Sequence, residues 1–215
     1  MATPAQLMQI VSETTGVPLP TVVDIDRRLV KAGLRAKAGR GLSAARMQPI
    51  DAARLLTGIL ASAQSNAAAE AVLRYEATRP DKARSSDGLF AGAASLEELS
   101  RLPPRHSFVE ALAGLIASAS RGAVAPLSGK TPSGSSPKIE VYSFTRATQG
   151  RIRISDLPDG ATVAVEYAVK AERGRRPAGR EKSGTADNGD LEQSRRITER
   201  TILAVADLLA EEMDT

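Results

Sequence analysis

The spacing of apolar residues in this 215-residue chain changes once, at residues 126–137, a stretch rich in Ser, Pro and Gly. Before it, apolar residues recur every three or four positions, which indicates amphipathic helices. After it, residues 138–145, 151–155 and 161–169 alternate apolar and polar side chains, which predicts three strands. The sequence DLPDG at residues 156–160 predicts a tight turn between the last two strands. The chain is therefore predicted to be mainly α, with a small antiparallel β element after a flexible linker.

Helix signals mark the ends of several predicted helices. Pro49 suits a first helical turn, and Asp51 complements the positive end of a helix dipole. Ser95 followed by Glu98, and Ser107 followed by Glu110, match the capping box. The predicted helices cover residues 5–15, 20–32, 49–79, 95–102, 107–123 and 190–213, the last of them an amphipathic helix that ends the chain.

The chemistry-bearing residue types exclude most kinds of active site. There is no Cys, so a disulfide framework, thiolate zinc and a Cys nucleophile are excluded. The single His106 follows LPPR and is expected to be a solvated or capping residue. The sequence SGKT at residues 128–131 lacks the first Gly of a phosphate-binding loop. We expect no enzyme activity, no cofactor and no metal.

The positive charge is concentrated at the beginning of the chain. Residues 1–50 carry seven basic and three acidic side chains, an excess of four, and the net charge of the whole chain is also +4. Charge segregated in this way favours a polyanionic partner at one end of the molecule. No apolar run is long enough for a membrane span and no targeting signal is visible, so we expect a cytoplasmic protein without a membrane partner.

Residues 8–27 form two predicted helical segments joined at Gly16. A glycine permits the left-handed backbone that a sharp corner requires. Val11 and Ser12 would face the second segment, and Val22 and Ile25 would face inward from it. This pattern resembles the helix-turn-helix family of DNA-binding proteins, in which outward residues of the second helix enter the major groove.

The next residues resemble a winged helix. RRLVKAGL (residues 27–34) is similar to the end of a winged-helix recognition helix, and RAKAGRG (residues 35–41) would be the wing. A third helix would come from residues 49–62. The resemblance implies double-stranded DNA as the partner, with contacts from Pro20, Thr21, Asp24, Arg27, Arg28, Lys31, Arg35, Lys37, Arg40 and Arg46.

A second basic strip lies near the end of the chain. RGRRPAGR (residues 173–180) loosely resembles an AT-hook, within a segment, residues 170–190, whose composition is typical of disorder. A cationic strip of this kind can lie along phosphates or in a minor groove. The alternative interpretation is a solvated linker. The basic residues concerned are Arg173, Arg175, Arg176 and Arg180.

Four segments follow from these features. Residues 1–62 form the predicted helix-turn-helix unit, residues 63–125 a helical region for packing or oligomerisation, residues 126–137 the linker, and residues 138–215 the β element with the basic loop and last helix. We expect a homo-oligomeric bacterial or phage transcriptional regulator. The order of elements is also similar to that of phage small terminase subunits. A protein-interaction adaptor, or a plain helical hairpin with a basic face, are the remaining alternatives.

Overall fold

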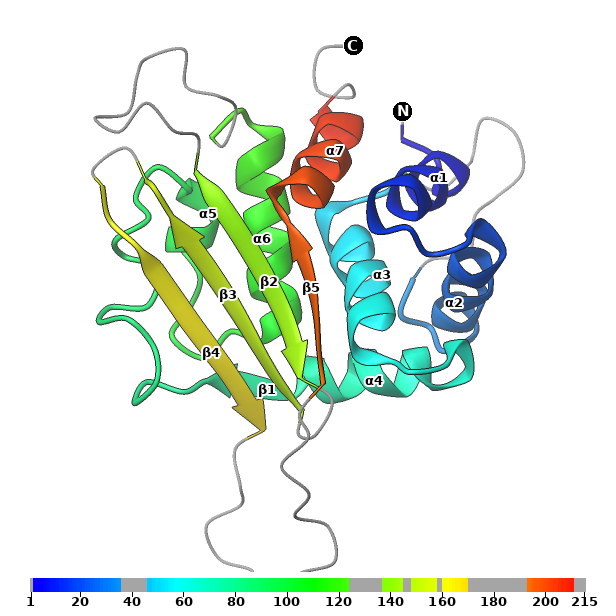
Figure 1. Cartoon of the computed structure of the whole chain (residues 1–215), viewed down its shortest axis with the longest axis horizontal. Coiled ribbons are helices and arrows are strands. Elements are labelled where there is room, and N and C mark those ends of the chain that lie inside the picture. The colour runs from blue at the N-terminus through cyan, green and yellow to red at the C-terminus, as the bar shows by residue number, and fades with distance from the viewer. Residues whose placement is uncertain are drawn as a thin grey trace, which may run out of the picture.

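A computed structural model describes residues 2–35, 46–123, 137–144, 148–157, 160–169 and 193–210. These residues form a mixed α/β structure in which helices pack on one face of an antiparallel sheet (Figure 1). The α-helices are α1 (Pro4–Thr15), α2 (Leu19–Lys31), α3 (Pro49–Ala61), α4 (Ala68–Glu76), α5 (Glu97–Ser100), α6 (Phe108–Ser120) and α7 (Glu199–Ala210). The strands are β1 (Thr78–Pro80), β2 (Lys138–Phe144), β3 (Gln149–Ser155), β4 (Val163–Val169) and β5 (Ser194–Thr198).

The sheet has the strand order β1-β4-β3-β2-β5, and every neighbouring pair is antiparallel. The three predicted strands are confirmed as β2, β3 and β4. The prediction of only three strands is wrong, because β1 and β5 extend the sheet at its two edges. β1 contains only three residues, and its Pro80 is tolerated because β1 is an edge strand.

The predicted continuous helix over residues 49–79 is wrong. α3 ends at Ala61, Ser62 takes an extended conformation, and a 3₁₀ turn, η2 (Ser65–Ala67), leads into α4. The carbonyl groups left unpaired where a helix ends need other donors. Arg195 of β5 is such a donor, because its guanidinium donates to the carbonyl oxygens of Ile59 and Ser62. A partner distant in the sequence thus completes the end of α3.

The last helix begins later than the predicted start at residue 190. Residues 194–198 form β5, in which Ile197 is buried and lies opposite Val141 of β2. α7 begins only at Glu199, whose carboxylate accepts a hydrogen bond from the backbone N–H of Ile139. The sequence of residues 190–213 did not indicate a strand because β5 has only five residues and Ile197 is its only apolar one.

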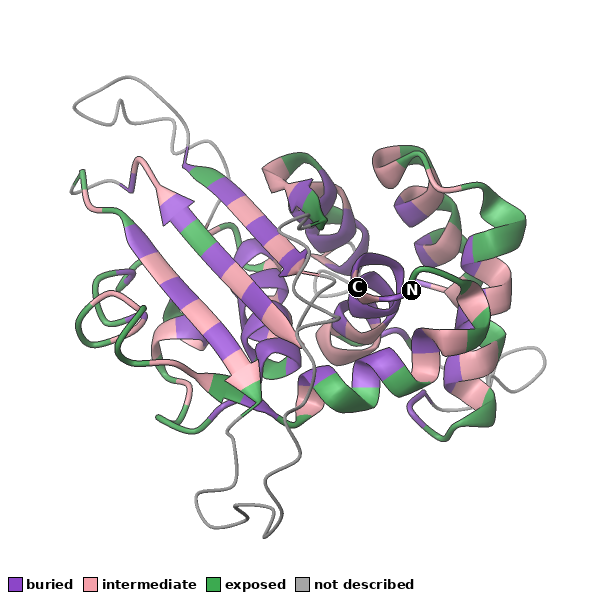
Figure 2. Ribbon diagram, turned by 60° about the horizontal axis from the view of Figure 1, so that its bottom comes forward, coloured by how far each residue is buried: buried purple, intermediate pink, exposed green. Residues whose placement is uncertain are grey.

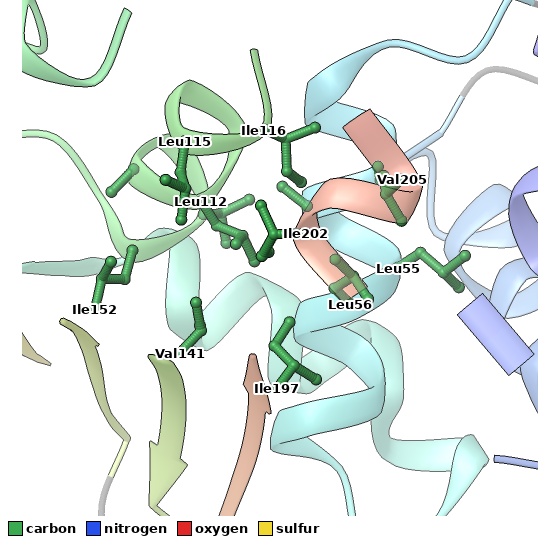
Figure 3. Close-up of a cluster of buried hydrophobic side chains, with 14 of the residues drawn as sticks. Leu55, Leu56, Leu112, Leu115, Ile116, Val141, Ile152, Ile197, Ile202 and Val205 are labelled. Carbon is green, nitrogen blue, oxygen red and sulfur yellow. The ribbon is translucent and has the colours of Figure 1, made fainter. Parts of the chain in front are cut away.

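Side chains alternate between the two faces of the sheet, as the striped burial pattern of the strands shows (Figure 2). The inward-facing residues meet α3, α6 and α7, and the close-up of this region shows the resulting cluster (Figure 3). One continuous core extends from Ala2 to Leu209, since α7 packs against both α6 and α1. The predicted division into four segments stays a prediction, but segments from both ends of the chain share this core. The labelled core residues are Leu55, Leu56, Leu112, Leu115, Ile116, Val141, Ile152, Ile197, Ile202 and Val205.

The two predicted capping boxes have different outcomes. Ser107 caps α6, and the side chain of Glu110 accepts from the backbone N–H of Ser107, as predicted. The box at Ser95 is wrong, because α5 begins after Leu96 and has no side-chain cap. α5 contains only four residues, so it is held by Leu99, which is fully buried against α6.

His106 is not the solvated residue that its loop sequence indicated. It is 2% exposed and lies against the ring of Tyr167. Its Nδ1 is 2.7 Å from the carbonyl oxygen of Pro103, and its Nε2 is 2.8 Å from the Tyr167 hydroxyl. Because a carbonyl oxygen only accepts, Nδ1 carries the proton and Nε2 accepts from Tyr167. Burial lowers the pKa of His106 and raises that of Tyr167 well above its usual value.

Within the described residues, no helix combines the length and the apolar character that crossing a membrane requires.

Candidate nucleic-acid interface

The corner between α1 and α2 forms at the predicted glycine. Gly16 has φ 73° and ψ 7°, the left-handed conformation, and its N–H donates to the carbonyl oxygen of Ser12. The Ser12 hydroxyl donates to the carbonyl oxygen of Val17 at 2.7 Å, which ties the end of α1 to the turn. α2 then begins at Leu19, with Pro20 in its first turn. The two helices and the glycine turn match their predicted positions, while the DNA-binding assignment stays a prediction.

The inward side of this corner is apolar, as the sequence predicted. Val11 and Val22 are fully buried, and Ile25 is nearly so. α3 packs against α2 and so supplies a third helix. Because these contacts fix how α1 and α2 cross, the remaining side of α2 is held in a defined direction.

Four of the predicted contact residues lie exposed on α2. Pro20 and Thr21 lie in its first turn, and Arg27 and Lys31 lie in its second half. Neither Arg27 nor Lys31 forms a hydrogen bond or an ion pair with any other described residue. Lys31, in the last turn of α2, is favoured there by the helix dipole, and both cations remain available to an anionic partner.

Asp24 is engaged by two neighbours. Its carboxylate accepts from Nε of Arg28 at 3.0 Å and also from the hydroxyl of Ser65 in η2. The hydrogen bond from Ser65, followed by that from Arg28, lowers the pKa of Asp24. The carboxylate therefore stays ionised near neutral pH and pairs with Arg28, and the charge of Arg27 also contributes to lowering its pKa. Among the described residues, Arg27 and Lys31 are the cations of α2 that form no ion pair.

Arg35, which the winged-helix resemblance placed in the wing as a DNA contact, is buried. Arg35 is 7% exposed, and its Nη2 lies 2.5 Å from Oδ2 of the buried Asp26. A charge buried in a protein needs a partner, and here Asp26 lies on the inward side of α2. Arg35 therefore fixes the segment that follows α2 to the core and does not face a duplex.

The remaining predicted contacts lie beyond α2. Arg46 is exposed and precedes Met47, whose N–H donates to the carbonyl oxygen of Ala2 at 3.3 Å. The chain thus returns to the start of α1 after the predicted wing. Lys37 and Arg40 lie outside the described residues, and so does the basic strip of Arg173, Arg175, Arg176 and Arg180.

The outward face of the sheet carries cross-strand ion pairs. Arg151 donates from Nε and Nη2 to Glu166, and Arg196 donates from Nη1 to Glu140 at 2.7 Å. The guanidinium of Arg196 also lies 5.9 Å from the ring centre of Tyr142. Cross-strand pairs of this kind stabilise an antiparallel sheet. Arg153 also lies 3.9 Å from Glu140, so three arginines share two glutamates and this face keeps a positive excess of its own.

Two partners of the candidate interface had no local signal in the sequence. Ser65 lies 41 positions from Asp24, and η2 was predicted as part of a helix. Asp26 was predicted inside the reading helix, yet only the fold shows that it meets Arg35. The acidic residues on α2 could have suggested intramolecular pairing, but nothing in their spacing identifies the partners.

Comparisons with family models, with curated proteins and with solved structures gave no match for this chain.

Proposed function

We propose that this protein binds double-stranded DNA through the exposed side of α2, as an oligomeric regulator. The observation that carries the proposal is which cations on and directly after α2 form ion pairs and which do not. Within α2, the acidic residues are matched to Arg28 and Arg35, whereas Arg27 and Lys31 are exposed and unpaired. A rigid corner that presents unpaired cations suits an extended array of phosphates.

The proposed mechanism relies mainly on phosphate contacts. Arg27 and Lys31 would neutralise phosphates and set the orientation of α2. Thr21, at the start of the helix, would reach a phosphate or a thymine methyl group, because the first residues of a recognition helix approach the base edges. Arg28 can contribute to the field of α2 while it remains paired with Asp24.

The test is a binding measurement with a charge-matched control. Fluorescence anisotropy with a labelled random 30-base-pair duplex would compare the wild type with Arg27→Ala/Lys31→Ala and with Lys82→Ala/Arg105→Ala. Each double variant loses two exposed cations, but the second pair lies outside α2. We expect the first variant to lose about tenfold or more in affinity, since each contact contributes about 1 kcal/mol or more. The control should change by about twofold at most.

Equal losses in the two variants would mean that net charge, and not the surface of α2, determines binding. No measurable binding by the wild type at low salt would contradict the proposal altogether. If a preferred site is found, Thr21→Ala should reduce affinity for that site more than for random duplex. A uniform loss would instead assign Thr21 to a phosphate.

The alternatives differ in their assemblies and partners. Size-exclusion chromatography with light scattering, with and without duplex, separates them. A dimer that binds duplex supports a regulator, whereas a ring of about eight or more subunits supports a packaging protein similar to a phage small terminase subunit. A protein partner recovered without DNA, together with no duplex binding, would support the adaptor.

A further inference from the structure

A cleft lies between the α1–α2 corner, the end of α3 and the edge strand β5. Its volume is about 430 Å³, which falls within the range of small-molecule sites. The corner contributes Thr15, Val17, Thr21 and Ile25, and β5 contributes Arg195, Arg196 and Ile197. The rest of the lining comes from the end of α3 and the residues after it, namely Ile59, Leu60, Ser62, Ala63, Gln64 and Ser65.

The lining combines an apolar surface with a few polar groups. Ile25, Ile59 and Ile197 are buried core residues that each line the cleft. The side chains of Thr21 and Gln64 make no hydrogen bond to another described residue, so they remain available to a ligand. An apolar site with a small number of unpaired polar groups is the usual composition of a pocket for an organic molecule.

The charge of the lining is positive. It contains two guanidinium groups and no carboxylate. The guanidinium of Arg196 is engaged with Glu140 and Tyr142 on the outward face of the sheet. Arg195 uses only Nη1, which donates to the carbonyl oxygens of Ile59 and Ser62. Its Nε and Nη2 have no partner among the described residues, so two N–H-bearing nitrogens remain to receive an anion.

We infer that this cleft binds a small organic anion, such as a carboxylate with a short hydrocarbon chain. The carboxylate would accept from Nε and Nη2 of Arg195, the paired geometry that guanidinium groups favour. The hydrocarbon chain would lie against Ile25, Ile59 and Ile197. Arg195 would be held in place for this task by the carbonyl groups at the end of α3.

Such a ligand would also change the electrostatic potential at α2. Thr21 and Ile25 belong to the helix that we propose to contact DNA, and they line the cleft. An added negative charge beside the first turns of α2 would repel the phosphates of a duplex, so the anion would weaken DNA binding. This coupling rests on the proposed function, whereas the ligand site itself does not.

Octanoate is a suitable probe, with octylammonium and 1-octanol as controls that share its chain. Amide chemical shifts of the full-length protein would be followed in titrations with each compound. We expect octanoate to bind saturably and to shift the amides of Val17, Ile25 and Ile197, and we expect the controls to bind at least tenfold more weakly. Equal binding of all three compounds, or shifts remote from the cleft, would overturn the site.

Three variants locate the binding. Arg195→Gln removes the proposed anion contact, and Arg200→Gln removes an exposed cation outside the lining. Ala63→Phe adds a bulky side chain to the lining while leaving Arg195 intact, so the test survives if Arg195→Gln does not fold. We expect at least a tenfold loss of octanoate affinity in Arg195→Gln and Ala63→Phe and less than a twofold change in Arg200→Gln. Unchanged affinity in Ala63→Phe would refute the site.

The same samples test the coupling. Saturating octanoate should weaken duplex binding by about fivefold or more, within the usual range of coupling between sites. Octanoate binding without any duplex binding would refute the proposed function and leave the ligand site standing. Duplex binding without octanoate binding would refute the ligand site alone.

Discussion

The Asp26–Arg35 ion pair shows how one contact between two residues determines which cations are accessible on and near α2. Both side chains are almost completely buried, at 8% and 5% exposed. Burying either charge alone costs more than burying the pair, because the remaining charge has lost both water and partner. The pair thus holds the end of the α1–α2 unit and removes Arg35 from the set of cations that could meet a duplex.

Replacing Arg35 with methionine should therefore destabilise the protein strongly. We expect Arg35→Met to lower the free energy of unfolding by about 3–5 kcal/mol, since Asp26 would be left buried without a countercharge. The double variant Asp26→Leu/Arg35→Met should recover much of this loss. Urea denaturation followed by circular dichroism measures both. Additive losses in the double variant would show that the two side chains act independently.

His106 makes the stability depend on pH. Its pKa in the folded protein lies below the ordinary value because burial disfavours the imidazolium. Between the folded pKa and the unfolded value, about 6.5, the unfolded chain binds more protons than the folded one. The free energy of unfolding should thus fall as the pH decreases below about 6.5 and reach its full value above it.

The variant His106→Gln tests this assignment, because glutamine can donate to Pro103 and accept from Tyr167 without titrating. Urea midpoints at pH 5.5, 6.5 and 7.5 would be compared. We expect the urea midpoint of the wild type to fall as the pH is lowered from 7.5 to 5.5, and that of His106→Gln to fall clearly less. Identical pH dependence of the two proteins would assign the effect to other groups.

At the scale of elements, α6 and β3 approach so closely that one position admits only glycine. A Cβ atom added at Gly150 would lie 2.6 Å from Cδ2 and Cε2 of Phe108. Phe108 is fully buried and its ring also lies edge-on to the rings of Tyr75 and Tyr167. The ring therefore has packed aromatic neighbours on two sides, and a side chain at position 150 would force Phe108, α6 or β3 to shift.

Gly150→Ala should overpack this contact. We expect it to lower the free energy of unfolding by about 1–3 kcal/mol, as is usual for an added methyl group in a dense core. Gln149→Ala, at the neighbouring outward position of β3, should have a much smaller effect. Thermal and urea denaturation of the three proteins would measure the difference. Equal stability of Gly150→Ala and the wild type would mean that α6 can shift away from the sheet.

On the scale of the whole molecule, α3 and α7 lie between the sheet and the α1–α2 unit and join the two (Figure 1). α7 packs against α1, and α3 contacts both α2 and β5. The proposed DNA surface and the cleft beside β5 therefore rest on one core. A ligand or a duplex bound at either place acts on the same body, which is why the coupling proposed above is physically reasonable.

The described cations of the proposed interface predict a salt dependence of DNA binding. Arg27, Arg28, Lys31 and Arg46 are the accessible cations among the predicted contacts that it describes. If all four neutralise phosphates, the slope of log K against log salt concentration should be about −3.6, at about 0.9 per phosphate. Affinity would then fall roughly a hundredfold between about 50 and 200 mM salt. Anisotropy titrations at several salt concentrations would measure this, and a slope near zero would contradict phosphate-driven docking.

Local features of the fold follow from the sequence because their partners are adjacent in the chain. Gly16 marks the corner since the left-handed conformation is a property of one residue, and the box of Ser107 and Glu110 spans a single turn. The strands β2, β3 and β4 were predictable because their alternation continues over seven residues each. In the candidate interface, the same reasoning identified the buried residues Val11, Val22 and Ile25.

Only the tertiary structure decided which charges of α2 are paired and where the longer helical patterns end. Arg195 completes the end of α3 from 133 positions away from Ser62, and Ser65 reaches Asp24 across 41 positions. Burial of Arg35 depends on where the chain turns after α2, which residue types alone do not specify. Periodicity reports the face that a segment buries, whereas the partner that satisfies a buried or terminal polar group is fixed only when distant segments meet.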